Sequence, residues 1–483
     1  MKSKTINSLF WKLLERFGVS GVQFVLQILL ARLLDPEHYG VLSIMIIFTT
    51  LANVFVQNGF NTALIQNKDV TEEDYSSVFW VSLSIAGVLY GVIYACAPLI
   101  GSFYEMPDLV LPLRVLALIL FPGALNSIQV AKISREMNFK KIFVSNVAAV
   151  IISGVAGITI AYMGGGLWAL VVQNAVNILV ACVVMVFTAK LKLRFVCDFK
   201  RVKVLFSYGW KLLVSSLIDT LYQDLRSLVI GKKYDEGTLG YYNRGKQFPQ
   251  FVINAINGAV QSVMLPAMAL KQDTKDEVKA LMRRAISVSA YIIFPMMAGL
   301  AACAEPLVRL LLTDKWLPCV PYLQIYCFTF AFYPVHTSNL QTINAMGRSD
   351  IFLKLEIIKK TYGIVALLIA IFCFDSPIAI AMTGVVTAGI GCFVNSFPNK
   401  KLIGYSYFEQ MRDILPSFVA SMVMFLGVWA LSVLALHPMI LLMVQVVVGV
   451  VFYLIVSLVF RFKPFLMIID MVKTALKKKN EAV

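Results

Sequence analysis

A series of long apolar segments constrains this chain more than any other feature of its sequence. Of its 483 residues, 59% are hydrophobic and only 14% are charged, whereas soluble domains are about half apolar and a quarter charged. A membrane-crossing helix needs about 20 mostly apolar residues. We interpret fourteen segments as such helices, near 9–34, 41–65, 77–101, 109–131, 142–163, 167–189, 204–230, 239–268, 285–307, 318–346, 357–374, 377–396, 414–436 and 439–460. The composition therefore predicts a polytopic all-α membrane protein and excludes an ordinary cytosolic enzyme.

The charged residues predict how these helices are oriented. Lys and Arg total 43 against 27 Asp and Glu, a formal net charge of +16. With the N-terminus inside, most cations fall in cytoplasmic loops and only Lys232, Lys233, Arg309 and Lys315 fall outside, as the positive-inside rule requires. In a soluble protein this charge would suggest nucleic-acid binding, but here we expect no nucleic-acid partner. The prediction is that both termini face the cytoplasm.

The sequence lacks the motifs of several classes of function. The predicted loops are too short for a soluble catalytic domain, and no GxxxxGK[ST] phosphate-binding loop is present. Eight cysteines show no CxxC spacing and three histidines show no HExxH spacing, so we expect no metal site, no catalytic residues and no cofactor. The first apolar segment contains charged and amide residues, so we expect it not to be a cleaved signal peptide.

The chain repeats itself after about 200 residues. Four matches recur in register: Trp11 to Leu14 with Trp210 to Leu213, Asp35…Gly40 with Asp235…Gly240, amides of the second span with those of the eighth, and Pro122-x3-Asn126-Ser127-x-Gln129 with Pro334-x3-Ser338-Asn339-x-Gln341. Six spans separate the copies, so both halves have the same orientation, as in parallel-repeat transporters. We predict a six-helix lobe at 1–200, a second at 201–400, and two additional helices with a basic tail at 401–483.

Polar side chains recur at helical spacing along four of the predicted spans. The candidates to line a polar cavity between the halves are Gln23, Gln27, Asn53, Gln57, Asn61, Gln250, Asn254, Asn257 and Gln261. Buried amides also join neighbouring helices directly, which is the alternative explanation of any single stripe. Because the stripes occupy repeat-equivalent helices, we favour the cavity.

Charged residues within the spans indicate the kind of substrate. Each costs about 2.5–3.5 kcal/mol at the centre of a bilayer, so they mark functional positions. Cations outnumber anions there, and a cationic cavity suits an anionic substrate because guanidinium groups match phosphate oxygens. The candidate substrate-binding cations are Arg16, Arg32, Lys211, Arg226 and Arg244. The alternatives are snorkelling to the interface for the cations near helix ends, and pairing with Asp219 or Asp224 for Arg226.

Four further residues are candidates for coupling, gating or proton relay. Asp219 is the candidate for coupling to an H⁺ or Na⁺ gradient, or else a charge partner of Arg226. Pro122 and Pro334 should kink equivalent helices and are candidate gating residues. His336 is either a proton relay or a packed neutral histidine.

Several stretches of the chain resemble one membrane-protein family. They are Leu30 to Asp35 followed by Tyr39-Gly40, Asn58-Gly59-Phe60 with Ile65-Gln66, Arg135 to Phe139, and Asp314-Lys315-Trp316. They are similar to Wzx-type polysaccharide (O-antigen and exopolysaccharide) flippases, near the colanic and teichuronic acid exporters. These belong to the MOP superfamily with the multidrug (MATE) exporters and lipid II flippases.

The resemblance implies a function as well as a fold. It implies a MATE-like fold and a flippase in the bacterial inner membrane. Such a flippase moves undecaprenyl-pyrophosphate-linked oligosaccharide repeat units from the inner to the outer leaflet, by alternating access of two six-helix lobes around a cationic cavity. The partners implied are this lipid-linked oligosaccharide, membrane lipid and the polysaccharide polymerase machinery. It associates the last two helices with a groove for the lipid tail. The alternatives are a multidrug exporter, a membrane-embedded polymerase or ligase, and a non-transporting scaffold.

Overall fold

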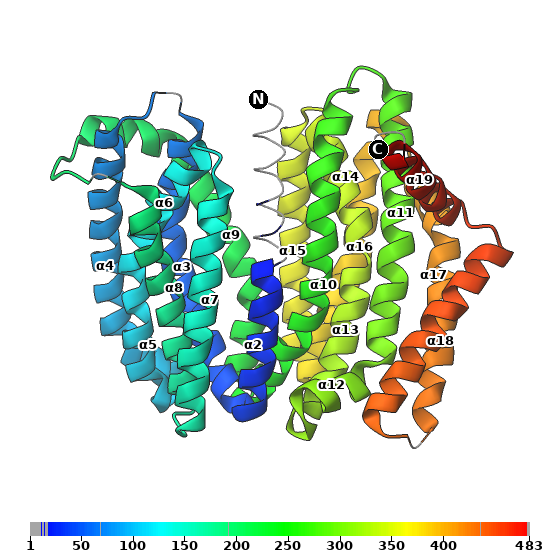
Figure 1. The fold of residues 1–483 in the computed structure, drawn as a ribbon, viewed down its shortest axis with the longest axis horizontal. Coiled ribbons are helices and arrows are strands. Elements are labelled where there is room, and N and C mark those ends of the chain that lie inside the picture. The colour runs from blue at the N-terminus through cyan, green and yellow to red at the C-terminus, as the bar shows by residue number, and fades with distance from the viewer. Residues whose placement is uncertain are drawn as a thin grey trace. The chain divides into compact units, whose positions relative to one another are not determined.

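The computed structural model describes residues 18–67, 69–191, 193–434 and 436–480, together with Trp11 and Leu14. Within these residues all regular structure is helical, and the chain forms two compact units, Met1–Gly240 and Tyr241–Val483 (Figure 1). The predicted all-α fold is confirmed. The repeat boundary predicted near residue 200 stays a prediction, because the units are defined by packing and helix Phe199–Lys233 packs with the first unit.

The first unit is built from long helices joined by short turns. Its elements are α2 (Ser20–Leu33), α3 (Pro36–Gln66), α4 (Glu72–Tyr104), η2 (Pro107–Leu109), α5 (Val110–Leu116), η3 (Ala117–Ile119), α6 (Leu120–Arg135), α7 (Phe139–Tyr162), α8 (Leu167–Ala189), α9 (Phe199–Lys233) and the start of α10 (Glu236–Ala269). Helix α3 contacts α6 and α9 along much of its length, and α7 packs on α8. Helix α3 is therefore central to this unit.

The second unit repeats this plan and extends it. Its elements after α10 are α11 (Lys275–Ala302), α12 (Ala304–Leu312), η4 (Asp314–Cys319), α13 (Val320–Ala331), α14 (Tyr333–Ala345), α15 (Ser349–Cys373), α16 (Pro377–Ile403), α17 (Tyr407–Ala430), η5 (Leu431–Val433), α18 (Pro438–Val459) and α19 (Lys463–Asn480). Helix α11 contacts α13, α14 and α17. The predicted basic tail is helical: α19 packs against α11, with Phe465 beside Tyr291 at a ring distance of 6.2 Å.

Wherever the structure describes them, the predicted spans coincide with one helix or with consecutive helices. Among the described residues, nine helices are long and apolar enough to cross a membrane, and ten if the bent helix α9 is counted. The other four predicted spans fall on α2, α10, the broken pair α13 and α14, and α15. Helix α15 is not among the nine because it carries several charged residues, among them Lys354, Glu356, Lys359 and Lys360. The chain is a multi-pass membrane protein, and fourteen crossings are compatible with this structure.

Helix starts follow from local side-chain chemistry. Thr71 and Asp74 form a reciprocal capping box at the start of α4, and Ser406 and Glu409 do so at the start of α17. Such boxes satisfy two backbone N–H groups that the first helical turn leaves without partners. Asp74 is buried and also accepts from Arg201 of α9 at 3.2 Å. This cap therefore also ties α9 to α4.

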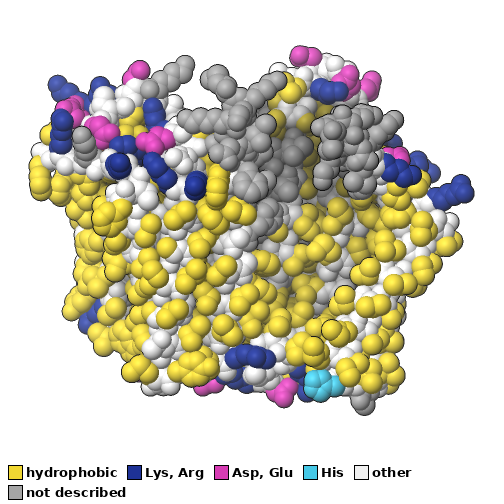
Figure 2. Space-filling view, viewed as in Figure 1, with side chains coloured by type: hydrophobic (Ala, Val, Ile, Leu, Met, Phe, Trp, Pro, Cys, Tyr) yellow, Lys and Arg dark blue, Asp and Glu magenta, His cyan; other side chains and the backbone are white. Residues whose placement is uncertain are grey.

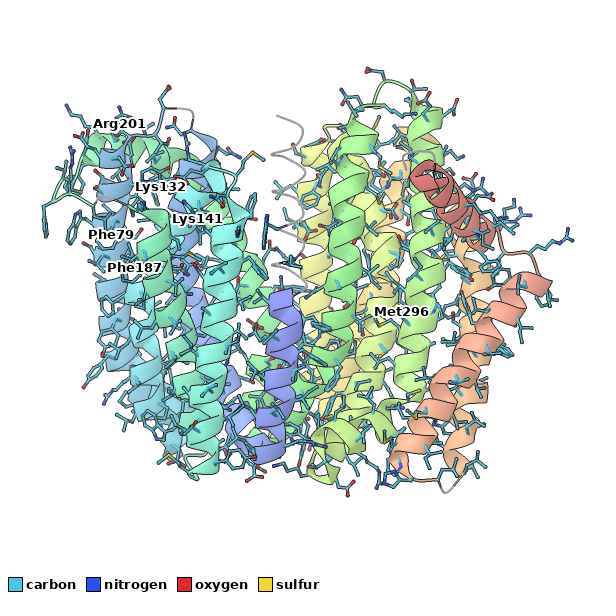
Figure 3. All side chains as sticks on the ribbon, in the orientation of Figure 1. Phe79, Lys132, Lys141, Phe187, Arg201 and Met296 are labelled. Atoms are coloured by element: carbon cyan, nitrogen blue, oxygen red, sulfur yellow. The ribbon has the colours of Figure 1, made fainter. Side chains whose placement is uncertain are left out.

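The surface of each unit has the polarity of a membrane protein. On the face shown in Figure 2, hydrophobic side chains cover the middle of each unit and charged side chains lie toward its ends. In the first unit Lys132, Lys141 and Arg201 lie together at one end, and Phe79 and Phe187 lie nearer the middle (Figure 3). Exposed Phe187 and Val155 suit lipid contact.

Candidate functional site

The polar stripe on α3 faces α6 within the first unit. Asn61 donates to the hydroxyl and the backbone carbonyl of Ser127 at 3.2 and 3.3 Å, and Gln57 donates to Asn53 at 3.2 Å. A methyl group on Gly123 of α6 would lie 3.0 Å from Oδ1 of Asn53, so the two helices approach closely here. All three amides remain half-buried. The stripe thus joins α3 to α6 within the first unit.

The equivalent stripe on α10 contains both bonded and exposed amides. Asn257 accepts from the Thr337 hydroxyl of α14 at 2.6 Å. Asn254 and Gln261 are exposed, and Gln250 is half-buried. Asn61 in the first unit and Asn257 in the second therefore both bond to the broken span that carries the repeated proline. The two contacts use different positions of the repeat, since Asn61 corresponds to Gln261 and Ser127 to Asn339 in the sequence match.

The glutamines of α2 and the candidate cations are distributed over several elements. Gln23 and Arg32 of α2 are exposed and Gln27 is half-buried, while Lys211 of α9 is exposed. Arg226 and Asp219 of α9 are both half-buried. Arg16 lies outside the described residues. Substrate binding by these residues and ion coupling by Asp219 stay predictions.

Arg244 has a different environment from the other cations. Its side chain is 4% exposed, donates to Gln247 at 2.6 Å and lies 5.2 Å from the centre of the Trp316 ring. A guanidinium over an indole face is stabilised by the ring quadrupole. These contacts hold η4 against the start of α10 in this conformation, and a role for Arg244 in substrate binding stays a prediction.

Both repeated prolines lie where their spans are broken. Pro122 follows η3 within the first turn of α6, and Pro334 lies in the first turn of α14 directly after α13 ends. Proline lacks the N–H that would continue the preceding helix. Their role in gating stays a prediction.

A buried amide network in the second unit was not predicted as a network. Asn339 of α14 exchanges hydrogen bonds with Gln410 of α17 at 2.8 and 3.1 Å, and Asn399 of α16 donates to Asn339 at 2.7 Å. All three are fully buried. The repeat motif singled out Asn339, but no spacing rule links it to residues 60 and 71 positions away. The network fixes the mutual positions of three helices.

His336 lies beside this network. Its Nδ1 is 3.0 Å from the amide nitrogen of Asn395, and its Nε2 is 3.8 Å from the Cys392 sulfur. Both ring nitrogens therefore lie close to polar or polarizable groups of α16. Both alternatives for His336, a proton relay and a packed neutral histidine, stay predictions.

Helices α11, α17 and α18 enclose an apolar groove. It has a volume of about 480 Å³, and aliphatic side chains, methionines and two tyrosines supply nearly all its lining. Met296, labelled in Figure 3, lies on the α11 side, and Gly449 with Val450 lies on α18. The Tyr291 hydroxyl donates to the Ser457 hydroxyl at 2.8 Å, and the Tyr453 hydroxyl donates to the backbone carbonyl of Tyr291 at 3.1 Å. The groove is therefore suited to a hydrocarbon chain.

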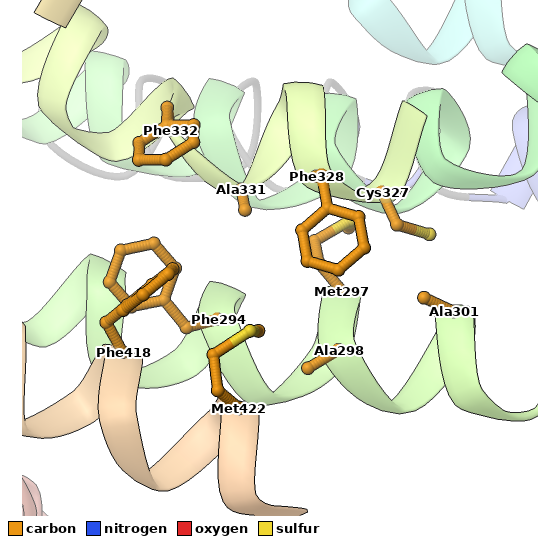
Figure 4. A pocket seen from close by; sticks show the side chains of 10 residues that line it. All are labelled: Phe294, Met297, Ala298, Ala301, Cys327, Phe328, Ala331, Phe332, Phe418 and Met422. Atoms are coloured by element: carbon orange, nitrogen blue, oxygen red, sulfur yellow. The ribbon is translucent and has the colours of Figure 1, made fainter. Parts of the chain in front are cut away.

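A second apolar crevice between α11, α13 and α17 is much smaller. Phe294, Phe328 and Phe418 converge on it (Figure 4), and its volume is about 10 Å³. That is the room for roughly one water molecule, and its wall is apolar. We regard this crevice as a packing defect rather than a ligand site.

Comparisons with known proteins agree with these features. The model of a family described as "Polysaccharide biosynthesis protein" matches residues 29–321. The lipopolysaccharide biosynthesis protein WzxC of Escherichia coli K12 is 24% identical, over 86% of this chain and 83% of its own length. The succinoglycan biosynthesis transport protein ExoT of Rhizobium meliloti is 22% identical, over 86% of this chain and 82% of its own length. The teichuronic acid biosynthesis protein TuaB of Bacillus subtilis is 23% identical over 71% of each chain.

Solved structures show the same fold. The lipid II flippase MurJ in an inward closed conformation matches with a TM-score of 0.76 at 16% identity, covering 94% of this chain and 98% of that one. An inward-facing MATE transporter of the MOP superfamily matches with a TM-score of 0.61 at 15% identity, covering 81% of this chain and 98% of that one. The predicted MATE-like fold is thereby confirmed. Because the family model covers more than half of the sequence, the chain belongs to the polysaccharide biosynthesis protein family.

Proposed function

We propose that this protein is a flippase that moves lipid-linked oligosaccharide repeat units from the inner to the outer leaflet for surface polysaccharide synthesis. The observation that carries the proposal is the set of relatives aligned along most of the chain. They are named for lipopolysaccharide, succinoglycan and teichuronic acid biosynthesis, and one is named as a transport protein. A transporter needs no catalytic residues, in keeping with the expectation from the sequence.

The physical task matches what the helices offer. A sugar headgroup cannot cross about 30 Å of hydrocarbon without hydrogen-bond partners. The half-exposed amides of α3 and α10 would bond the sugar hydroxyls. Arg226, Lys211 and Arg32 would hold the pyrophosphate at successive stages of alternating access.

The lipid tail has a candidate site of its own in the groove between α11, α17 and α18. An undecaprenyl chain is apolar, and so is the groove, which has a volume of about 480 Å³. Gly449 keeps it open, since a methyl group there would lie 3.3 Å from Val428 and 3.7 Å from Met424. The two additional helices would thus hold the tail while the headgroup crosses.

The proposed location is the bacterial inner membrane with both termini in the cytoplasm. The support is the asymmetry of Lys and Arg between alternate loops, since cytoplasmic loops retain positive charge. An H⁺ or Na⁺ gradient acting through Asp219 would supply the driving force. A polymerase acting on the delivered repeat unit is the proposed partner.

The test is a deletion strain that makes one known surface polysaccharide, with leaflet-specific labelling of the lipid-linked repeat unit. We expect the unit to accumulate at the cytoplasmic face, and wild-type protein but not Arg226→Ala to reverse this. Arg226→Lys, which keeps the charge, is the matched control and should restore part of the activity. Normal export by Arg226→Ala at normal abundance would contradict the role of this cation.

A further inference from the structure

The first turns of α3 and α10 cross at two glycines. A methyl group on Gly40 would lie 1.9 Å from the carbonyl oxygen of Glu236, and one on Gly240 would lie 2.1 Å from the carbonyl oxygen of Pro36. Backbone atoms cannot rotate away as the end of a side chain can, and any non-glycine residue carries at least this methyl group. The helices could not keep this separation with any other residue at either position. We call these four residues the glycine crossing.

The crossing is reciprocal, and the sequence repeat encodes it. Each glycine contacts the first residue of the opposite helix, and the pairs 36 with 236 and 40 with 240 keep the offset of 200. Tyr39, 7% exposed, and Leu239, fully buried, lie beside the two glycines in the sequence. The repeated stretch Asp35…Gly40 is thus the surface through which two helices meet.

Like charges gather around this close contact. Glu37 reaches the first turn of α10, where a methyl group on Gly237 would lie 3.1 Å from its Oε1. Asp235, Glu236 and Asp108 of η2 carry further carboxylates near this turn. The nearby Lys232 pairs with Glu105 at 2.9 Å. Tight packing therefore favours the contact and carboxylate repulsion opposes it, which suits a contact that opens and closes.

We propose that Gly40 and Gly240 are positioning residues of an outer gate. Their crossing closes the outer ends of α3 and α10, and it must part for the transported headgroup to leave. The inference rests on the proposed function and on the proposed topology, which places this end outside. It assigns a role to the repeated stretch Asp35…Gly40, to which the sequence alone assigns no function.

The test compares Gly40→Ala and Gly240→Ala with Gly87→Ala. Gly87 is a matched control because it lies within helix α4 and a methyl group there meets nothing within 4 Å. Each change is also made in a Gly237→Cys reporter, whose thiol would be buried in the closed crossing. Because Cys197 and Cys373 are exposed, the reporter and its parent carry serine at both positions. The measurements are protein abundance, transport, and the rate at which an impermeant maleimide added outside labels the reporter.

We expect the two crossing variants to raise the labelling rate at least tenfold and to lower transport at least tenfold, with abundance within twofold of wild type. Transport and labelling equal to those of Gly87→Ala would overturn the gate. Unchanged labelling with reduced abundance would mean that the two glycines serve packing alone, and this result would also overturn the gate.

A second measurement keeps Gly40 and Gly240. The double variant Glu37→Cys with Gly237→Cys, in protein that carries serine at positions 197 and 373, is linked by a short bis-methanethiosulfonate reagent. Linkage should stop transport and reduction should restore it, whereas continued transport through the linked protein would overturn the gate. If the substrate class is wrong, transport is absent in wild type as well, but the labelling difference between Gly40→Ala and Gly87→Ala remains.

Discussion

Individual amides in this protein serve two different purposes. Asn61 and Asn257 bond to a neighbouring helix and stay half-exposed, while Asn339, Asn399 and Gln410 are fully buried and bond one another. A buried amide that loses its partner costs about 1–3 kcal/mol. The second kind is structural, and substrate binding by the first kind stays a prediction.

Replacement of Asn339 tests the structural role. Asn339→Ala removes the partner of two buried amides, so we expect the free energy of unfolding to fall by about 2 kcal/mol. Asn344→Ala, in the same helix but exposed, is the control and should change it by less than about 0.5 kcal/mol. Thermal unfolding of the purified protein measures both. Equal midpoints for the two variants would show that the network adds no stability.

At the scale of elements, the contact between α3 and α10 should respond to pH. Burial raises the pKa of the Glu236 carboxyl, which precedes the predicted span, and the charges of Asp108, Glu37 and Asp235 raise it further. The closed crossing therefore binds a proton more tightly than the open one, where these groups separate. Closing is favoured as the pH falls through this pKa, and the advantage is lost as the pH rises above it.

The reporter Gly237→Cys measures this pH response. We expect labelling, corrected for the intrinsic pH dependence of a thiol, to speed up as the pH outside rises. Glu236→Gln should flatten the response, because the amide cannot ionise. The cations nearby are Lys232, paired with Glu105, and Lys233, beside the ring of Tyr234. A pH response that survives in Glu236→Gln would contradict the assignment to this carboxyl.

The groove on α18 gives a second prediction for an element. Gly449→Phe would fill it and should lower transport at least tenfold, because the lipid tail loses its site. Gly427→Phe, on neighbouring α17 where an added methyl group meets nothing within 4 Å, should leave transport within twofold. Transport is measured as surface polymer at matched protein abundance. Equal activity in both variants would exclude the groove as a tail site.

At the scale of the whole molecule, the sequence predicted the helices better than their contacts. Apolar runs long enough to cross a bilayer leave few alternatives to helix, so the described part of each predicted span coincides with one or more helices. The amide network and the glycine crossing join residues far apart in the chain, and periodicity carries no information about such pairs. The repeat nevertheless marked Asn339, Gly40 and Gly240 before any contact was known.

Some predictions concern features that no contact within a unit can test. Arg16 lies outside the described residues, and the cavity predicted from the polar stripes would lie between the two repeats. The sequence predicted only a basic tail where the structure has helix α19, because the lysines dominate its composition. Phe465 and Ile468 nevertheless form an apolar face that packs on the second unit. The apolar residues of α19 are spaced for a helix that packs on one side.

The most direct test of the account is flipping by the purified protein in liposomes. A fluorescent lipid-linked oligosaccharide is incorporated in both leaflets, and a membrane-impermeant quencher reports the fraction that reaches the outside. The account predicts rapid exchange that requires the protein, is at least tenfold slower with Arg226→Ala, and is retained in part by Arg226→Lys. Exchange no faster than in protein-free liposomes, across several lipid-linked glycans and with an imposed H⁺ or Na⁺ gradient, would contradict it.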